Sequence, residues 1–142
     1  MKTYIFKTNL FYNKKIQREI EVIENASLYK LAAAIIKVYN FNFDHCFGFF
    51  SKVDERNYYD SDIKYELFAD LEDQGIEPVE SGSVKKTKIK EVWNNTGDKM
   101  LFLFDYGDNW LFVVELVGFG EKDNSKKYPK VLKKIGRAPK QY

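Results

Sequence analysis

The chain has 142 residues, of which 44% are hydrophobic and 17% aromatic, and its formal net charge is +2. This length and composition exclude a disordered chain and suit one hydrophobic core, so we expect a single domain over residues 1–142. The single cysteine excludes an internal disulfide, and no apolar run approaches the roughly 20 residues that span a bilayer, so we expect a cytoplasmic protein with no membrane partner.

The charges are unevenly distributed along the chain. Residues 54–80 hold ten acids against two bases, and residues 121–142 hold eight bases against two acids. We favour the interpretation that both segments are solvated faces that attract one another within the fold. The alternative is that the basic segment forms a patch for an anionic partner.

The N-terminal residues predict a β-hairpin. Residues 3–12 alternate in the manner of a strand, Asn13 and Lys14 supply a turn, and residues 16–23 alternate again. Arg18 then lies in the middle of the apolar face of the second strand, where a guanidinium is costly unless it is paired.

An amphipathic helix is expected over residues 27–39, with Asn25-Ala26-Ser27 as the source of the N-cap and Asn40 as the terminator. The apolar residues recur at helical spacing, at Leu28, Leu31, Ala32, Ile35, Ile36 and Tyr39. A buried strand follows at residues 45–51 because aromatic residues leave it few polar positions.

The middle of the chain lacks clean periodicity. We expect loops with one minor element over residues 52–80 and a second helix over 87–95, with Trp93 facing inward and Gly97 as its stop. After Gly120 the chain is polar and rich in lysine, and we expect the segment near Tyr128 to dock while the final residues fray.

A second hairpin is expected over residues 99–117, with a three-residue loop at Gly107–Asn109 and a positive φ at a Gly or Asn. This register gathers the following residues on one core face: Met100, Phe102, Phe104, Tyr106, Trp110, Phe112, Val114 and Leu116. Together these elements predict an α+β fold, a mainly antiparallel sheet of about five strands packed with two main helices.

The loop sequence Phe104-Asp105-Tyr106-Gly107-Asp108-Asn109-Trp110 resembles the signature of the plasmid pRiA4b ORF-3-like family of bacteria and archaea. Weaker similarity lies in residues 16–22, 27–39 and 44–49 and at Tyr128-Pro129. Where that family usually has Trp-Arg-Arg, this chain has Gln17-Arg18-Glu19, so only Arg18 corresponds. The resemblance implies a domain of uncharacterised function.

Arg18 requires a partner if it is buried, and Asp105 is the carboxylate that we expect to form an ion pair with it. The alternative is that Arg18 forms the floor of a pocket for an anionic ligand. His45 is the only histidine, and we interpret it as a satisfied strand residue and the adjacent Cys46 as a buried thiol.

Asp105 and Asp108, with Glu115 or His45, are too few oxygen ligands for a hard cation, which needs about six. We therefore expect no metal and interpret Asp108 as a residue that shapes its own turn. The phosphate loop, the dinucleotide fingerprint and the zinc spacings are all missing from the sequence, so we expect no cofactor.

We therefore expect a non-catalytic binding or interaction domain of unknown partner, with Arg18, His45, Asp105, Asp108 and Trp110 as candidate ligand-binding residues. One alternative is a nucleic-acid-associated protein of mobile-element type that uses its lysine-rich segments, Lys85, Lys86, Lys88 and Lys90 among them. Another is an uncharacterised enzyme that uses Asp105, Asp108 and His45.

Overall fold

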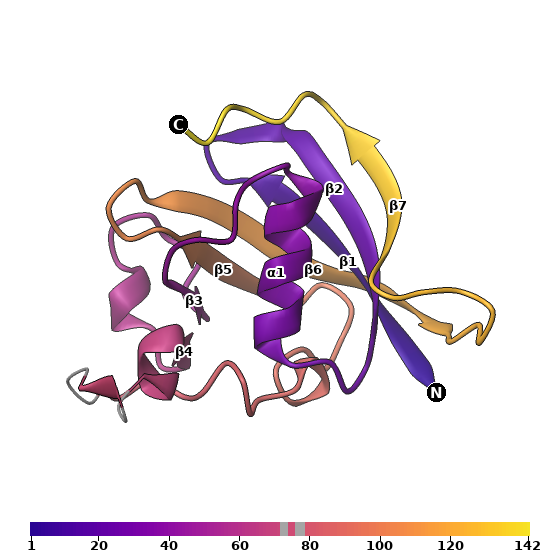
Figure 1. Ribbon diagram of the computed structural model, residues 1–142, viewed down its shortest axis with the longest axis horizontal. Helices are drawn as coiled ribbons and strands as arrows, with labels where there is room; N and C mark the ends of the chain where they lie inside the picture. Colours follow the sequence, from indigo (N-terminus) through magenta and orange to yellow (C-terminus); the bar gives the residue numbers. More distant parts are fainter. Residues whose placement is uncertain (72–73, 76–78) are drawn as a thin grey trace.

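The computed structural model describes residues 1–71, 74–75 and 79–142, and it shows one antiparallel sheet with a helix across one face (Figure 1). The strands are β1 (Lys2–Leu10), β2 (Asn13–Ile23), β3 (Phe47–Phe50), β4 (Lys64–Glu66), β5 (Lys99–Phe104), β6 (Trp110–Glu121) and β7 (Lys130–Ile135), in the order β4-β3-β5-β6-β1-β2-β7. Within the described residues α1 (Leu28–Val38) is the one α-helix. The α+β class is confirmed, but seven strands replace about five and one main helix replaces two.

β1 and β2 form the first hairpin, with its turn at Phe11 and Tyr12. The expected turn at Asn13 and Lys14 is wrong because Asn13 already pairs with Leu10. An apolar turn residue is acceptable here because Phe11 packs against a second hydrophobic cluster. The apolar face predicted for the second strand is confirmed by the burial of Arg18, Ile20 and Val22. The matching face of β1 consists of buried residues, namely Tyr4, Phe6, Thr8 and Leu10.

Helix α1 begins and ends as its sequence predicts. The Ser27 hydroxyl accepts a hydrogen bond from the backbone N of Lys30 at 3.1 Å, which satisfies one unpaired donor of the first turn. Asn40 follows the helix with a φ of 62°, the left-handed conformation that ends many helices. The residues that face the sheet are buried, namely Leu28, Leu31, Ala32, Ile35, Ile36 and Val38.

The second hairpin has a five-residue loop, Asp105–Asn109, because Phe104 pairs with Trp110. The expected three-residue loop is therefore wrong. Asn109 has a positive φ, as expected of an Asn, but Asp105 also has one, at 66°, which is uncommon for a residue that is not glycine. The longer loop places Tyr106 on the opposite face from the expected one, against the second cluster, which contains Phe50.

Among the described residues of the segment 52–98 are β4 and short 3₁₀ turns at Tyr58–Asp60, Leu67–Asp70 and Ile89–Glu91. The expected helix over 87–95 is wrong. Main-chain hydrogen bonds instead tie this segment to the start of α1, because Leu28 N donates to Thr87 O and Ile89 N to Ala26 O. These bonds leave room for only one helical turn. Trp93 is fully buried as expected, and its Nε1 donates to the carbonyl of Val114 at 3.3 Å.

The C-terminal segment forms β7, which pairs with β2 at one edge of the sheet (Figure 1). The final residues do not fray. Gln141 accepts a hydrogen bond from Asn42 N at 2.7 Å, and the Tyr142 hydroxyl donates to Asp44 Oδ2 at 2.7 Å. A lysine-rich edge strand lacks the alternation on which sequence analysis relies, and this explains why β7 was missed.

The acidic and basic segments lie at opposite edges of the sheet, beside β4 and in β7 respectively (Figure 1). The favoured interpretation, that they attract one another within the fold, is therefore wrong as far as direct contact is concerned. Three of the acids in 54–80, Glu72, Asp73 and Glu77, lie outside the described residues. Among the described residues, no helix has the length and apolar character needed to cross a membrane.

Candidate functional site

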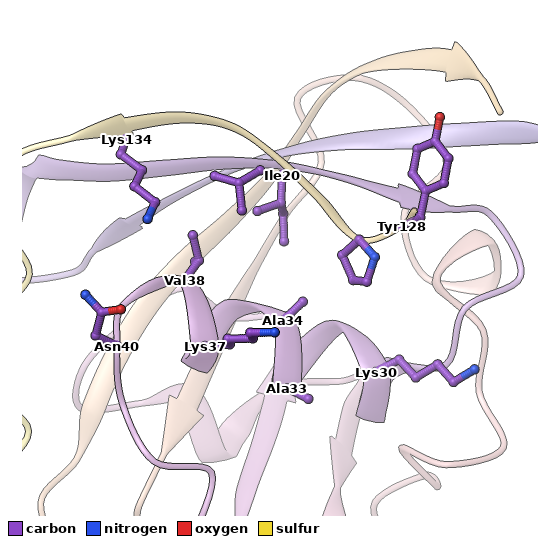
Figure 2. Close-up of a pocket in the computed structure, with 11 residues that line it drawn as sticks. Ile20, Lys30, Ala33, Ala34, Lys37, Val38, Asn40, Tyr128 and Lys134 are labelled. Carbon is purple, nitrogen blue, oxygen red and sulfur yellow. The ribbon is translucent and has the colours of Figure 1, made fainter. Parts of the chain in front are cut away.

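A groove with a volume of about 650 Å³ lies between α1 and β7 (Figure 2). The apolar part of its lining comes from β2, α1 and the β7 segment: Ile20, Ala33, Ala34, Val38, Pro129 and Val131. Asn40 and Lys134 lie at one end of the groove, and Lys30 and Tyr128 lie at the other (Figure 2). The groove is thus an apolar channel with polar ends.

Two local features of the chain create this groove. On α1, the short side chains of Ala33 and Ala34 leave space on the helix face that is turned towards β7. On β7, Lys133 pairs with Glu19 and Val131 with Ile20, so the intervening Leu132 is the extra residue of a bulge. Residues three apart face opposite sides of a regular strand, but the bulge lets both Val131 and Lys134 line the groove.

Lysines supply the charge of the groove. Lys30 and Lys37 extend from α1, and Lys134 extends from the opposite wall (Figure 2). None of the three ammonium groups makes an ion pair with any residue that the structure describes. The groove lining contains no carboxylate. All the charged side chains that line the groove are therefore positive.

Arg18 is buried beside this groove, with 4% of its surface exposed, but its partners are backbone carbonyls. Its Nε donates to Val38 O at 3.3 Å, and its Nη1 donates to Gln17 O, Ile135 O and Gly136 O at 2.7–3.1 Å. The guanidinium also lies 5.0 Å from the ring centroid of Tyr39.

The expected ion pair between Arg18 and Asp105 is wrong. Arg18 instead donates hydrogen bonds to backbone carbonyl groups. One of them is that of Val38 in the last turn of α1, where a cation is favourable. By bonding Val38 on one side and Ile135 on the other, it holds the two walls of the groove together at one end.

Asp105, which lies in the loop that follows β5, is instead close to His45. Its Oδ2 is 3.4 Å from His45 Nε2, and the other imidazole nitrogen is 2.7 Å from Asp44 Oδ1. The hydrogen bond from Tyr142 and the neighbouring imidazole lower the pKa of Asp44. Partial burial raises the pKa of Cys46, but its side chain is half-buried, so the expectation of a buried thiol is met only in part.

Asp105, not Asp108, shapes the hairpin loop. Asp105 Oδ1 accepts hydrogen bonds from Gly107 N at 3.0 Å and Asp108 N at 3.3 Å, whereas Asp108 is exposed and contributes only its backbone. The role expected for Asp108 is therefore wrong. Trp110 packs edge-on against Phe41, and its buried Nε1 has no hydrogen-bond partner among the described residues.

The remaining candidates lie apart. Among the described residues no three His, Cys, Asp or Glu side chains converge as metal ligands would, and Glu115 pairs with Lys99 on a different part of the hairpin. The lysine-rich segment is exposed beside the start of α1, with Lys85 Nζ over the Tyr29 ring at 5.2 Å. Nucleic-acid binding by Lys85, Lys86, Lys88 and Lys90 stays a prediction.

The groove residues were missed by sequence analysis. Lys30 and Lys37 are seven apart on one helix face with three alanines between them, and this was the available signal. The opposite wall could not be inferred without β7. A buried carboxylate was also missed, since Glu66, at 1% exposure, accepts hydrogen bonds from the hydroxyls of Tyr59, Tyr106 and Ser81.

Comparison with known proteins identifies a family and a solved structure of similar fold. The model of the family described as Plasmid pRiA4b ORF-3-like protein matches residues 2–141. The crystal structure of the protein of unknown function MM3350 from Methanosarcina mazei Go1 is 23% identical, with a TM-score of 0.76 over 97% of this chain and 71% of that chain. At this identity the likeness shows the fold alone. No curated protein matches the sequence.

Proposed function

This chain belongs to the Plasmid pRiA4b ORF-3-like protein family, and we propose that it is a non-catalytic binding domain whose ligand occupies the groove between α1 and β7. The solved structure named above is itself a protein of unknown function, so the proposal rests on the geometry of this chain. It retains the binding role expected from the sequence and moves the site from the neighbourhood of His45 and Asp105 to the groove.

The size and lining of the groove carry this proposal. Its volume of about 650 Å³ falls within the range of about 300–1,000 Å³ that small-molecule sites occupy. Such sites combine an apolar surface, which supplies most of the affinity, with a few polar groups that orient the ligand. The groove has this composition, with Ile20 and Val131 in its floor and Lys134 and Asn40 at one end.

The same lining supports binding rather than catalysis. The described residues that line the groove include no carboxylate, imidazole or thiol, the side chains that most often serve as general bases or nucleophiles. His45 and Asp105 lie outside the lining. The three lysines of the rim are exposed, and side chains of this kind at the ends of an apolar groove are suited to attracting an anion.

A neutral probe tests the site without any assumption about charge. In ¹H–¹⁵N spectra, titration with 1-decanol should shift the amides of α1 and β7 around the groove. Ala34→Phe places a ring in the groove and should weaken decanol binding about tenfold. Leu132→Phe adds the same ring to β7 outside the lining and should leave binding unchanged. Shifts confined to other surfaces, or equal binding by Ala34→Phe, would refute the proposal.

A further inference from the structure

The cross-strand pairs of β2 and β7 differ between the two faces of the sheet. On the face away from α1, Glu19 lies opposite Lys133, which is a pair of opposite charges. On the face that α1 covers, Arg18 lies opposite Lys134, which is a pair of like charges. Directly opposed like charges destabilise a sheet, so the second arrangement needs a separate explanation.

Neither cation of this like-charge pair is neutralised by a carboxylate among the described residues. Carbonyl groups hold Arg18, and they satisfy its hydrogen bonds but leave its full positive charge in place. Lys134 makes no ion pair there and reaches into the groove from the opposite wall (Figure 2). Because Arg18 is buried, its field is less screened by water than that of a surface lysine.

The positive charge is therefore concentrated at the end of the groove near Asn40 and Lys134, and the floor beyond it is apolar. Ile20 and Val131 form the next cross-strand pair along the strands, and both line the groove. The groove follows α1 from Asn40 towards Lys30, a length of roughly 15 Å at the helical rise per residue. This shape separates a site for an anionic head from a site for an apolar chain.

Resting on the proposed function, we propose that the ligand is a single-chain amphiphile with an acidic head, either a carboxylate or a phosphate. Its head accepts hydrogen bonds from Lys134 Nζ and the Asn40 amide, and it lies in the field of Arg18. Its chain runs over Ile20 and Val131 towards Pro129. An anion in this position supplies the negative charge that the pair of cations lacks.

Calorimetric titration with four ligands tests the head and the chain separately: decanoate, decyl phosphate, 1-decanol and acetate, each below its aggregation concentration. We expect one or both acidic amphiphiles to bind at least about fivefold more tightly than 1-decanol, since one partly shielded ion pair contributes about that factor. Acetate should bind far more weakly than decanoate because it has no chain to bury. The two acids show which head group the site prefers.

Two lysine variants localise the head group. Lys134→Gln should remove the advantage of the acids over 1-decanol and leave decanol binding unchanged. Lys133→Gln, the neighbouring lysine on the other face, should retain that advantage. Both positions are exposed, so unchanged melting temperatures should show that the variants fold normally.

The possible failures are distinguishable. If 1-decanol binds in the groove as tightly as the acids, the acidic head is refuted while the binding site stands. If Lys133→Gln and Lys134→Gln have equal effects, the placement of the head at Lys134 is refuted. If acetate binds as tightly as decanoate, the amphiphile is refuted. If neither decanol nor the acids bind, both this inference and the proposed function fail.

Discussion

Tyr106 donates its hydroxyl hydrogen to Glu66 at 2.5 Å, and this bond joins the loop of the second hairpin to β4 at the edge of the sheet. Glu66 is buried without a cationic partner among the described residues, and three hydroxyl groups satisfy its oxygens. Hydrogen bonds to a buried charged group are among the stronger ones in proteins. The family-like loop is thus anchored through Tyr106.

Tyr106→Phe should lower the free energy of unfolding by about 2 kcal/mol, because it removes a donor from a buried carboxylate. Tyr59→Phe removes a second donor to the same oxygen from a ring that is 47% exposed, and its cost should be smaller, about 1 kcal/mol. Urea denaturation of both variants measures the difference. Equal stability of Tyr106→Phe and the wild type would show that the bond contributes nothing.

Arg18→Met should destabilise the protein by about 3 kcal/mol, because it leaves carbonyls of β7 and of α1 without their shared donor. Arg18→Lys should recover little of this, since one ammonium cannot reproduce the geometry of the guanidinium fork. Hydrogen exchange distinguishes a local from a global effect. Amides of β7 should exchange faster than those of β5 and β6, and uniform exchange across the sheet would contradict a specific role at β7.

The free energy of unfolding should fall at alkaline pH because Tyr39 loses its proton less readily in the folded state. Burial raises the pKa of Tyr39 from 10.0 to about 12, and Thr8 and Arg18 partly offset the rise. Folding therefore favours the protonated phenol of Tyr39. The stability that this preference contributes is complete below pH 10 and is lost as the pH rises towards 12. The loss should amount to roughly 2 kcal/mol. Urea titrations at pH 9 and 11.5 measure it, and Tyr39→Phe should show a smaller loss than the wild type.

Asp105→Ala should lower stability by about 2 kcal/mol, because it removes the acceptor for Gly107 N and Asp108 N at a residue with positive φ. Asp105→Asn keeps an acceptor oxygen and tolerates this conformation, so it should cost less than half as much. Thermal unfolding compares the two. If the two variants are equally destabilised, the charge facing His45 matters more than the loop hydrogen bonds.

Local patterns predicted the elements whose interactions are close in the chain. Alternation in β1 and β2 and the helical spacing of α1 indicated which side chains are buried, and Ser27 and Asn40 marked the ends of the helix. The aromatic loop before Trp110 indicated the family. These signals succeed because capping and amphipathic periodicity depend on residues only a few positions apart.

Errors arose where partners distant in sequence decide the outcome. The helix expected over 87–95 is a single turn because its backbone bonds to the start of α1. Arg18 has carbonyl partners more than 100 residues away, at Ile135 and Gly136, and no sequence pattern connects them. The loop register differs from the expected one because the side chain of Asp105 accepts hydrogen bonds from backbone groups of the hairpin, in competition with strand pairing.

By itself, the sequence determined the α+β class, the apolar face of β2, the helix α1 and the family. Only the tertiary structure decided that β7 lies beside β2. This position creates the groove and the pairing of Arg18 with Lys134, and it separates both residues from Asp105. The physical reason is that β7 is an edge strand covered on one side, and such a strand needs little alternation of apolar residues. Its position depends on backbone pairing with a strand that is distant in the sequence. This pairing leaves almost no pattern in the local sequence.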